Sequence, residues 1–139
     1  MHKLSIGLAV LVAAAAMAGA ALAYPANTYA VKPTGMGAPQ SGTITFAAQG
    51  SDSTKITLTL KGEPAHADQP AHIHVGNCKH PGGVKIPLTD VVGGSSVTVV
   101  KKPLSEVMVT GTSVNVHKSA KELNVYVACG DVQFAMTGK

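Results

Sequence analysis

Short stretches in which polar and apolar residues alternate constrain this chain most strongly. Residues 43–46 and 55–61 alternate in this way, and a turn-forming cluster at residues 49–53 separates them. A period of two is typical of a strand with one buried face, so these stretches are predicted to form a hairpin. Further short β-prone runs follow between glycines and prolines, at residues 84–88, 96–101, 107–110, 114–117, 124–128 and 132–136. About eight short strands without a helical period predict an all-β sandwich or barrel.

Three segments are predicted to lie outside the strands. Residues 24–40 carry three prolines and two glycines and are expected to form an extended arm or loop. His80-Pro81-Gly82-Gly83 is predicted to be a short turn rather than regular structure. Ser119-Ala120-Lys121-Glu122 fits a capping box, which predicts a single helical turn.

The N-terminus has the three parts of a secretory signal peptide. Met1-His2-Lys3 is a basic start, residues 4–18 are an alanine-rich apolar run, and Ala21-Leu22-Ala23 is a cleavage signature. The apolar run is short for a membrane-spanning helix, which needs about 20 residues, and an uncleaved anchor is the alternative. Residues 1–23 are therefore predicted to be a signal peptide. Residues 24–139 are then one domain of a periplasmic or secreted protein, with no membrane contact after signal removal.

The two cysteines, Cys78 and Cys129, lie far apart in the sequence. An even number of cysteines in an exported protein favours one disulfide, which would stabilise the fold by about 4 kcal/mol in the chain-entropy model. The alternative is a pair of metal thiolates. It is the weaker interpretation, because neither cysteine has a second cysteine at metal-ligand spacing.

The charge pattern excludes several functions. All eleven cationic residues are lysines, whereas nucleic-acid-binding proteins rely on arginine for bidentate contacts to bases and phosphates. Nucleic acid is therefore excluded as a partner, and the mild lysine excess serves solubility or attracts a small anion. The sequence also lacks the motifs of serine hydrolases, phosphate-binding loops and paired-carboxylate hydrolases, so no catalytic residue is assigned.

Histidines at alternate positions form a candidate metal site. Side chains alternate between the faces of a strand, so His72 and His74 project from one face while Ile73 enters the core. His117 ends another predicted strand. Three neutral imidazoles from two strands suit copper or zinc.

Two other histidines lie near the predicted strand of His72 and His74. His80 lies two residues after Cys78 in a glycine-rich segment and is a candidate fourth ligand, with a solvated loop histidine as the alternative. His66 lies in a polar loop and is interpreted as a solvated residue.

Taken in order, several segments resemble the copper/zinc superoxide dismutase family, and in particular short bacterial exported proteins that carry its barrel. The resemblance implies an immunoglobulin-like Greek-key β-barrel, a disulfide between Cys78 and Cys129, and copper on His72, His74 and His117. The segments that carry it are Ser41-Gly42-Thr43-Ile44-Thr45-Phe46, Ala71-His72-Ile73-His74, Cys78, Asn115-Val116-His117-Lys118 and Tyr126-Val127-Ala128-Cys129-Gly130-Asp131-Val132.

The chain departs from the family's pattern at the zinc site and at the anion guide. The loop that would hold the bridging histidine and the zinc ligands is reduced to residues 79–83, so a zinc site cannot be assembled, although His80 is similar to one zinc ligand. The electrostatic loop is nearly gone as well. Tyr126 stands where the family has the arginine that guides superoxide, and Lys121 where it has the aspartate that links the two metal sites.

Three functions are compatible with these residues. The first is an exported copper-dependent superoxide dismutase, in which Lys79, Lys118 and Lys121 attract the superoxide anion. The second is a non-catalytic periplasmic protein that binds copper ions or confers copper tolerance, for which three histidines suffice. The third is a metal-free barrel that acts by interaction with a partner.

Overall fold

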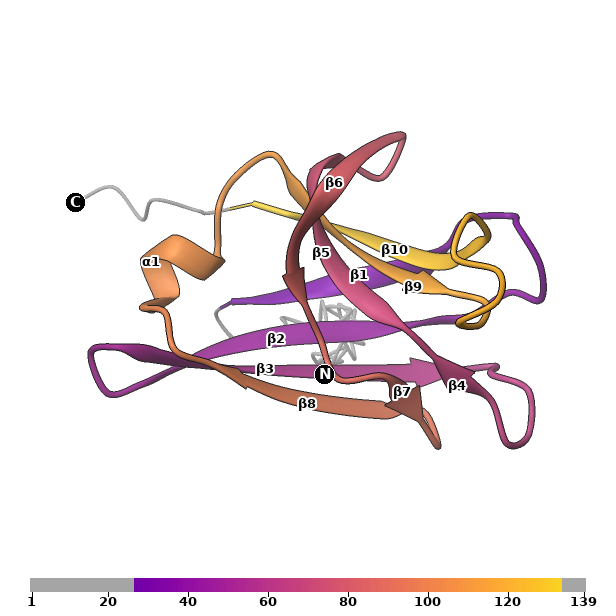
Figure 1. The fold of residues 1–139 in the computed structure, drawn as a ribbon, viewed down its shortest axis with the longest axis horizontal. Helices are drawn as coiled ribbons and strands as arrows, with labels where there is room; N and C mark the ends of the chain where they lie inside the picture. Colours follow the sequence, from indigo (N-terminus) through magenta and orange to yellow (C-terminus); the bar gives the residue numbers. More distant parts are fainter. Residues whose placement is uncertain (1–26, 134–139) are drawn as a thin grey trace, which may run out of the picture.

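Figure 1 shows the computed structural model, which describes residues 27–133. Ten strands and one short helix make up this part of the chain, and all the strand pairs are antiparallel. The helix is α1 (Leu104–Val107). The strands are β1 (Thr28–Pro33), β2 (Ser41–Gln49), β3 (Ser53–Lys61), β4 (Asp68–Gln69), β5 (Ala71–Asn77), β6 (His80–Pro87), β7 (Val91–Val92), β8 (Ser95–Val100), β9 (Thr112–His117) and β10 (Tyr126–Val132).

One curled sheet contains all the strands, in the order β4-β7-β8-β3-β2-β1-β10-β9-β5-β6. The sheet folds into two layers that share β1, which pairs with β2 on one side and with β10 on the other. In Figure 1, β2, β3 and β8 form the lower layer, and β5, β9 and β10 form the upper one. The chain passes between the layers three times, from β4 into β5, from β6 into β7, and from β8 through α1 into β9. At the first two crossings, the Leu88 N–H donates to the Ala71 carbonyl (3.0 Å). The prediction of an all-β barrel is confirmed.

The core lies between the two layers because alternate residues of each strand point inward. Ile44 and Phe46 of β2 face Leu58 and Ile56 of β3 in register, and all four are buried. This pairing confirms the predicted hairpin. On the opposite layer, β9 contributes two buried valines to the same core, and α1 covers one end of the barrel with Val107.

The predicted arm or loop holds for residues 34–40 but not for residues 28–33, and the predicted glycine-rich turn was wrong. Residues 28–33 form β1, which ends at Pro33, and both glycines and Pro39 come after the strand. The turn after β5 is at Cys78 and Lys79, where the Asn77 Oδ1 atom accepts the backbone N–H groups of Lys79 (3.1 Å) and His80 (3.0 Å). β6 therefore begins at His80 and contains both glycines.

Three further boundaries differ from the sequence predictions. Residues 107–110 are the end of α1 and the coil after it, not a strand. β10 runs without a break through Cys129-Gly130, because the missing side chain of Gly130 allows a close approach to the Ala30 carbonyl. Residues 119–122 form a turn closed by the Glu122 N–H and the Ser119 carbonyl (3.0 Å), and no helix is assigned there.

The signal peptide predicted for residues 1–23 lies outside the described residues, as does the end of the last predicted strand. Within residues 27–133, no helix is both long enough and apolar enough to cross a membrane.

Candidate metal centre

Three histidines from two neighbouring strands converge on the outer face of the upper layer. In the β5–β9 pair, Asn115 lies opposite His72 and Ser113 lies opposite His74. His117 is two residues beyond Asn115, so its side chain lies on the same face as both histidines of β5. The ring centroids of the three imidazoles are 4.8 to 5.6 Å apart. The structure thus brings together the three histidines that the sequence proposed as copper ligands.

Backbone carbonyls fix the orientation of two of the rings. His74 donates its Nδ1–H to the Gly82 carbonyl of β6 (2.8 Å), and His117 donates its Nδ1–H to the Leu123 carbonyl (2.6 Å). A carbonyl can only accept, so both neutral rings carry their proton on Nδ1 and a lone pair on Nε2. This is the hydrogen bonding that holds metal-binding histidines in a single tautomer.

His72 differs from His74 and His117 in that its Nδ1 atom, not its Nε2 atom, faces the site. Its Nδ1 atom is 2.9 Å from Nε2 of His117, and the His117 tautomer makes His72 the donor in the absence of metal. A bound metal would replace this hydrogen bond. Neutral His72 would then carry its proton on Nε2, which leaves Nδ1 free as a ligand.

Burial singles out one nitrogen as the most informative atom of the site. His74 and His117 are 4% and 3% exposed, whereas His72 is half-buried. The Nε2 atom of His74 is buried without a hydrogen-bond partner. A buried polar atom without a partner costs about 1–3 kcal/mol, so an unfilled acceptor of this kind indicates a missing ligand.

The candidate ligand atoms fit a transition-metal ion. All three lie within 4.8 Å of one another. A metal binds imidazole nitrogens at about 2.0–2.1 Å, which small rotations of these rings would satisfy. Three neutral imidazoles are typical donors for copper and zinc. No other group of this kind occurs in the described part of the chain.

The pKa values of two ligands are lowered. Burial lowers the pKa of His72, and the neighbouring His74 lowers it further. Burial is also the main cause of the lowered pKa of His117; its hydrogen bond to Leu123 acts in the opposite direction, and the other two imidazoles again lower the value. Both shifts keep the rings neutral, which is the form that binds a metal.

We expect the metal-free protein to lose stability as the pH falls from about 7 to about 5. A histidine in the unfolded chain has a pKa near 6.5, so the unfolded state takes up protons in this range that His72 and His117 resist in the fold. The free energy of unfolding is therefore highest above about pH 6.5 and decreases below it. Urea unfolding at several pH values measures this. A stability that is constant or rises on acidification would contradict it.

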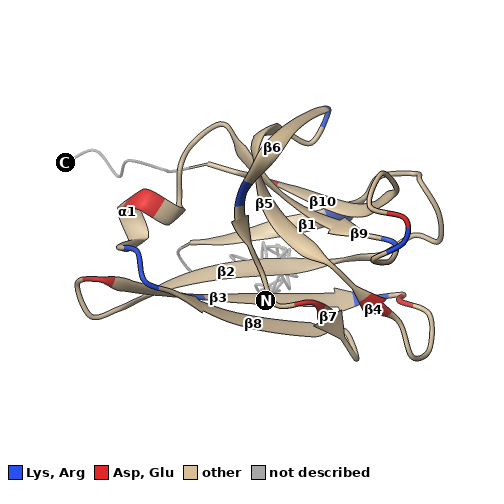
Figure 2. Cartoon of the chain, in the orientation of Figure 1, with Lys and Arg blue, Asp and Glu red and all other residues tan. Residues whose placement is uncertain are grey.

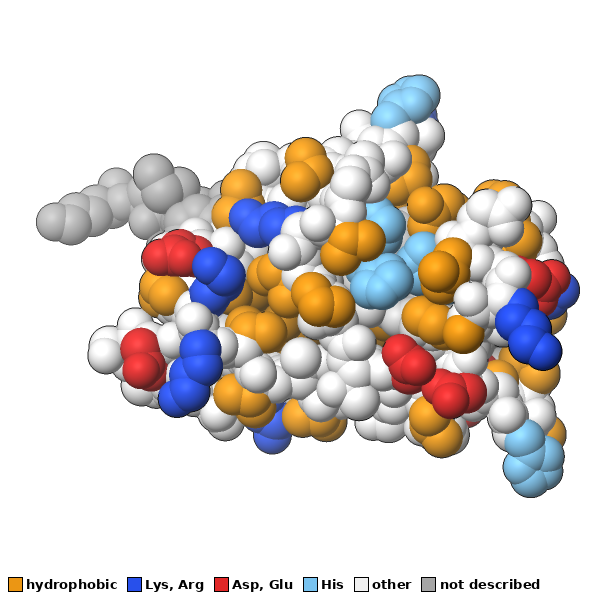
Figure 3. Space-filling model, viewed as in Figure 1, with side chains coloured by type: hydrophobic (Ala, Val, Ile, Leu, Met, Phe, Trp, Pro, Cys, Tyr) orange, Lys and Arg blue, Asp and Glu red, His pale blue; other side chains and the backbone are white. Residues whose placement is uncertain are grey.

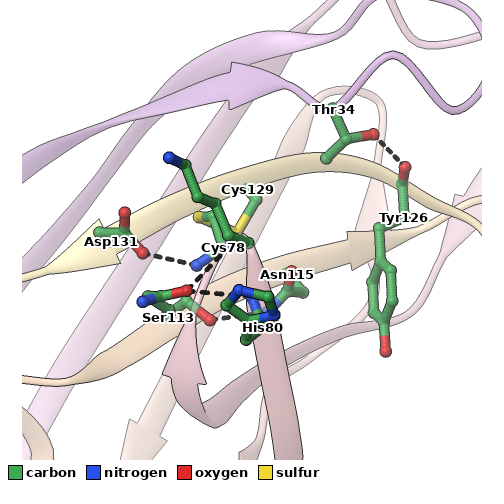
Figure 4. The surroundings of a disulfide bond; sticks show 10 residues. Thr34, Cys78, His80, Ser113, Asn115, Tyr126, Cys129 and Asp131 are labelled. Carbon is green, nitrogen blue, oxygen red and sulfur yellow. Dashed lines mark hydrogen bonds between the residues drawn. A yellow bond between two sulfur atoms is a disulfide. The ribbon is translucent and has the colours of Figure 1, made fainter.

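Tyr126 lies beside the three histidines, at the position where the family resemblance has the arginine that guides superoxide. It lies opposite His117 in the β9–β10 pair, and its ring centroid is 4.9 Å from that of His117 and 6.0 Å from that of His74. The Thr34 hydroxyl donates to its carbonyl (Figure 4). The sequence signal for this contact is the antiparallel register, which cannot be read before the strand pairing is known.

The predicted disulfide is confirmed. Cys78 and Cys129 are bonded, with 5.8 Å between their Cα atoms, so the alternative of two metal thiolates is excluded. The bond joins the turn after β5 to β10, and Asp131 accepts the Cys78 N–H in the same place (2.7 Å; Figure 4).

His80 is not brought into the group of three. Its side chain is exposed at the start of β6, beside Asn77 and the disulfide (Figure 4). His66 is exposed in the loop between β3 and β4. The structure therefore places three of the four predicted ligands together, and the role of His80 stays a prediction.

Comparison with known proteins yields structural neighbours alone. No protein-family model matches the chain, and no curated protein matches it. Two solved structures of variants of Candida albicans superoxide dismutase 5 match, with TM-scores of 0.56 and 0.53 at 17% and 18% identity. They cover 81% and 84% of this chain, and 95% of each neighbour is covered. The fold is of the superoxide dismutase type. At this identity the likeness concerns the fold, and it agrees with the Greek-key barrel that the sequence resemblance implied.

Proposed function

We propose that this protein binds one copper ion through Nδ1 of His72, Nε2 of His74 and Nε2 of His117. The observation that supports the proposal most directly is the buried Nε2 atom of His74, which has no partner and shares a site with two further imidazole nitrogens. Copper is preferred over zinc because Cu²⁺ stands at the top of the affinity order for nitrogen ligands.

The chain's own residues hold and orient this site. The carbonyls of Gly82 and Leu123 keep the Nε2 lone pairs of His74 and His117 directed to one point, so little reorganisation is needed on binding. Tyr126 covers one side of the rings, and half-buried His72 is the open side. Copper bound there would supply one-electron redox chemistry.

The metal content of the oxidised protein tests the proposal. We expect one copper per chain after exposure to micromolar Cu²⁺ and removal of excess metal, measured by inductively coupled plasma mass spectrometry. Competition with a chelator of known affinity gives the dissociation constant. An absence of bound copper in a folded, disulfide-bonded preparation would refute the proposal.

Superoxide dismutation is the second candidate, supported by the fold and by the half-exposed His72. If it applies, the copper-loaded protein removes superoxide faster than the same concentration of free copper, and a chelator that strips the metal abolishes the rate. A rate no greater than that of free copper would leave a copper-binding protein without turnover. A separate zinc ion is not part of this proposal, because the described residues bring together one group of potential ligands, the three histidines.

Export is proposed as well. A disulfide fits an oxidising compartment, and residues 1–23 have the three parts expected of a secretory signal peptide. Periplasmic fractionation with Edman sequencing of the mature protein tests both the location and the cleavage before Tyr24.

A further inference from the structure

One of the lysines that could attract an anion is paired with a carboxylate, and two others line grooves that none of the three histidines lines. Lys118 forms an ion pair with Glu122 (2.9 Å), and Lys121 lies in the same turn. Lys79 lines a groove beside the disulfide. Lys85 of β6 lines another groove beside α1, with Lys102 and Glu106.

Two acidic side chains lie on the face that carries the histidines, next to the histidine patch (Figure 3). Asp68 of β4 and Asp90, which precedes β7, are both exposed. Partial burial raises the pKa of Asp90, and the neighbouring Asp68 carboxyl group raises it further. Figure 2 shows the two acidic positions at β4 and β7. In Figure 3 a pair of acidic side chains lies beside the histidine patch, with no lysine between them.

The strand geometry explains this placement. β4 ends one residue before β5 begins, so Asp68 precedes His72 by only four residues. Four residues of chain separate the Asp68 and His72 Cα atoms by at most about 14 Å. Asp90 follows the β4–β7 register one position beyond the Gln69–Val91 pair, which puts it diagonally across from Asp68.

Tyr126, although uncharged, also favours a cation over an anion beside the three histidines. The face of an aromatic ring is electron-rich, so it attracts cations and repels anions. The Tyr126 ring packs against His117 and His74, and it brings no positive charge to this position.

We infer that the approach to the three histidines is built for a copper cation and not for superoxide, with Asp68 and Asp90 as specificity residues that draw the cation in. The inference rests on the proposed copper site and goes beyond it, since it assigns the incoming species. It makes the protein an acceptor of copper ions.

Stopped-flow measurement of copper association tests the inference. Aqueous Cu²⁺ is mixed with the full metal-free protein in a weakly coordinating buffer at pH 7, and quenching of tyrosine fluorescence reports binding. The test variant is Asp68→Asn with Asp90→Asn, which keeps the side-chain shapes. The matched control is Asp52→Asn, an exposed carboxylate in the β2–β3 turn at the far end of the barrel.

We expect the double variant to bind copper about threefold to fivefold more slowly at about 0.01 M ionic strength, with the difference gone near 1 M, where charges are screened within about 3 Å. The control should match the wild type. In the copper-loaded proteins, azide should bind the double variant more tightly than the wild type. Association rates that do not respond to the double substitution, or azide binding that it weakens, would overturn this inference alone. Failure of the wild type to take up copper would overturn the proposed function as well.

Discussion

Replacing His117 by alanine is expected to lower the affinity for copper by more than about 100-fold. Changes to residues that merely orient a metal ligand cost about 10–100-fold, and this change removes a ligand. His117 is the most informative position, because it contacts His72 through Nε2, receives its orientation from Leu123 and packs on Tyr126. The measurement is chelator competition followed through the visible absorption of the Cu²⁺ complex.

Controls separate loss of the site from loss of the fold. His66→Ala removes an exposed histidine far from the group of three and should leave the affinity unchanged. Circular dichroism and urea unfolding of the metal-free His117→Ala protein should show that the barrel persists. A folded His117→Ala protein with wild-type affinity would remove His117 from the copper site.

His80→Ala decides the remaining sequence prediction. His80 is exposed and lies outside the group of three, so we expect the copper affinity of this variant to stay within about twofold of the wild type. A tenfold loss would instead make it a fourth ligand, which would require the β5–β6 turn to move on metal binding.

The fold could be predicted from local sequence patterns where one face of a strand is buried and the other is exposed to solvent. β2 and β3 are of this kind, and their alternation fixes both the strands and their register. β1 could not be found in this way, because Pro33 at its end and the glycines after it outweigh a short alternating run. Because glycine is typical of turns, the sequence predicts a turn at Gly82 and Gly83 and a break between two strands at Gly130. In the structure Gly82 and Gly130 are needed because another backbone passes close to them.

The candidate site shows the same division. Period-two spacing places His72 and His74 together from the sequence alone. The carbonyls of Gly82 and Leu123 carry no side-chain signal, since any residue could supply them. The proximity of Asp68 and Asp90 depends on the β4–β7 register, which no local sequence pattern predicts. The ligands were therefore predictable, whereas the groups that orient them and charge their surroundings required the three-dimensional structure.

Removing the disulfide is expected to lower the free energy of unfolding by about 4 kcal/mol. Cys78 and Cys129 are 51 residues apart, and in the chain-entropy model the loss of a cross-link of this span gives the unfolded chain that much additional freedom. The measurement is urea unfolding of the oxidised wild type against the Cys78→Ala, Cys129→Ala double variant. Treatment of the wild type with a reductant should produce a similar loss, and the double variant should not respond to it.

The same variant shows how far the copper site depends on the cross-link. The bond anchors the turn between β5 and β6 to β10, yet His72 and His74 are also held by the β5–β9 pairing, which remains. The contact at risk is that of His74 with Gly82, because β6 is an edge strand that pairs with β5 alone. We therefore expect a loss of copper affinity of about 10-fold, as for a weakened orienting contact, and much less than for His117→Ala. A loss as large as that of His117→Ala would mean that the hairpin detaches without the disulfide, and an unfolding free energy within about 1 kcal/mol of the wild type would contradict the cross-link's role in stability.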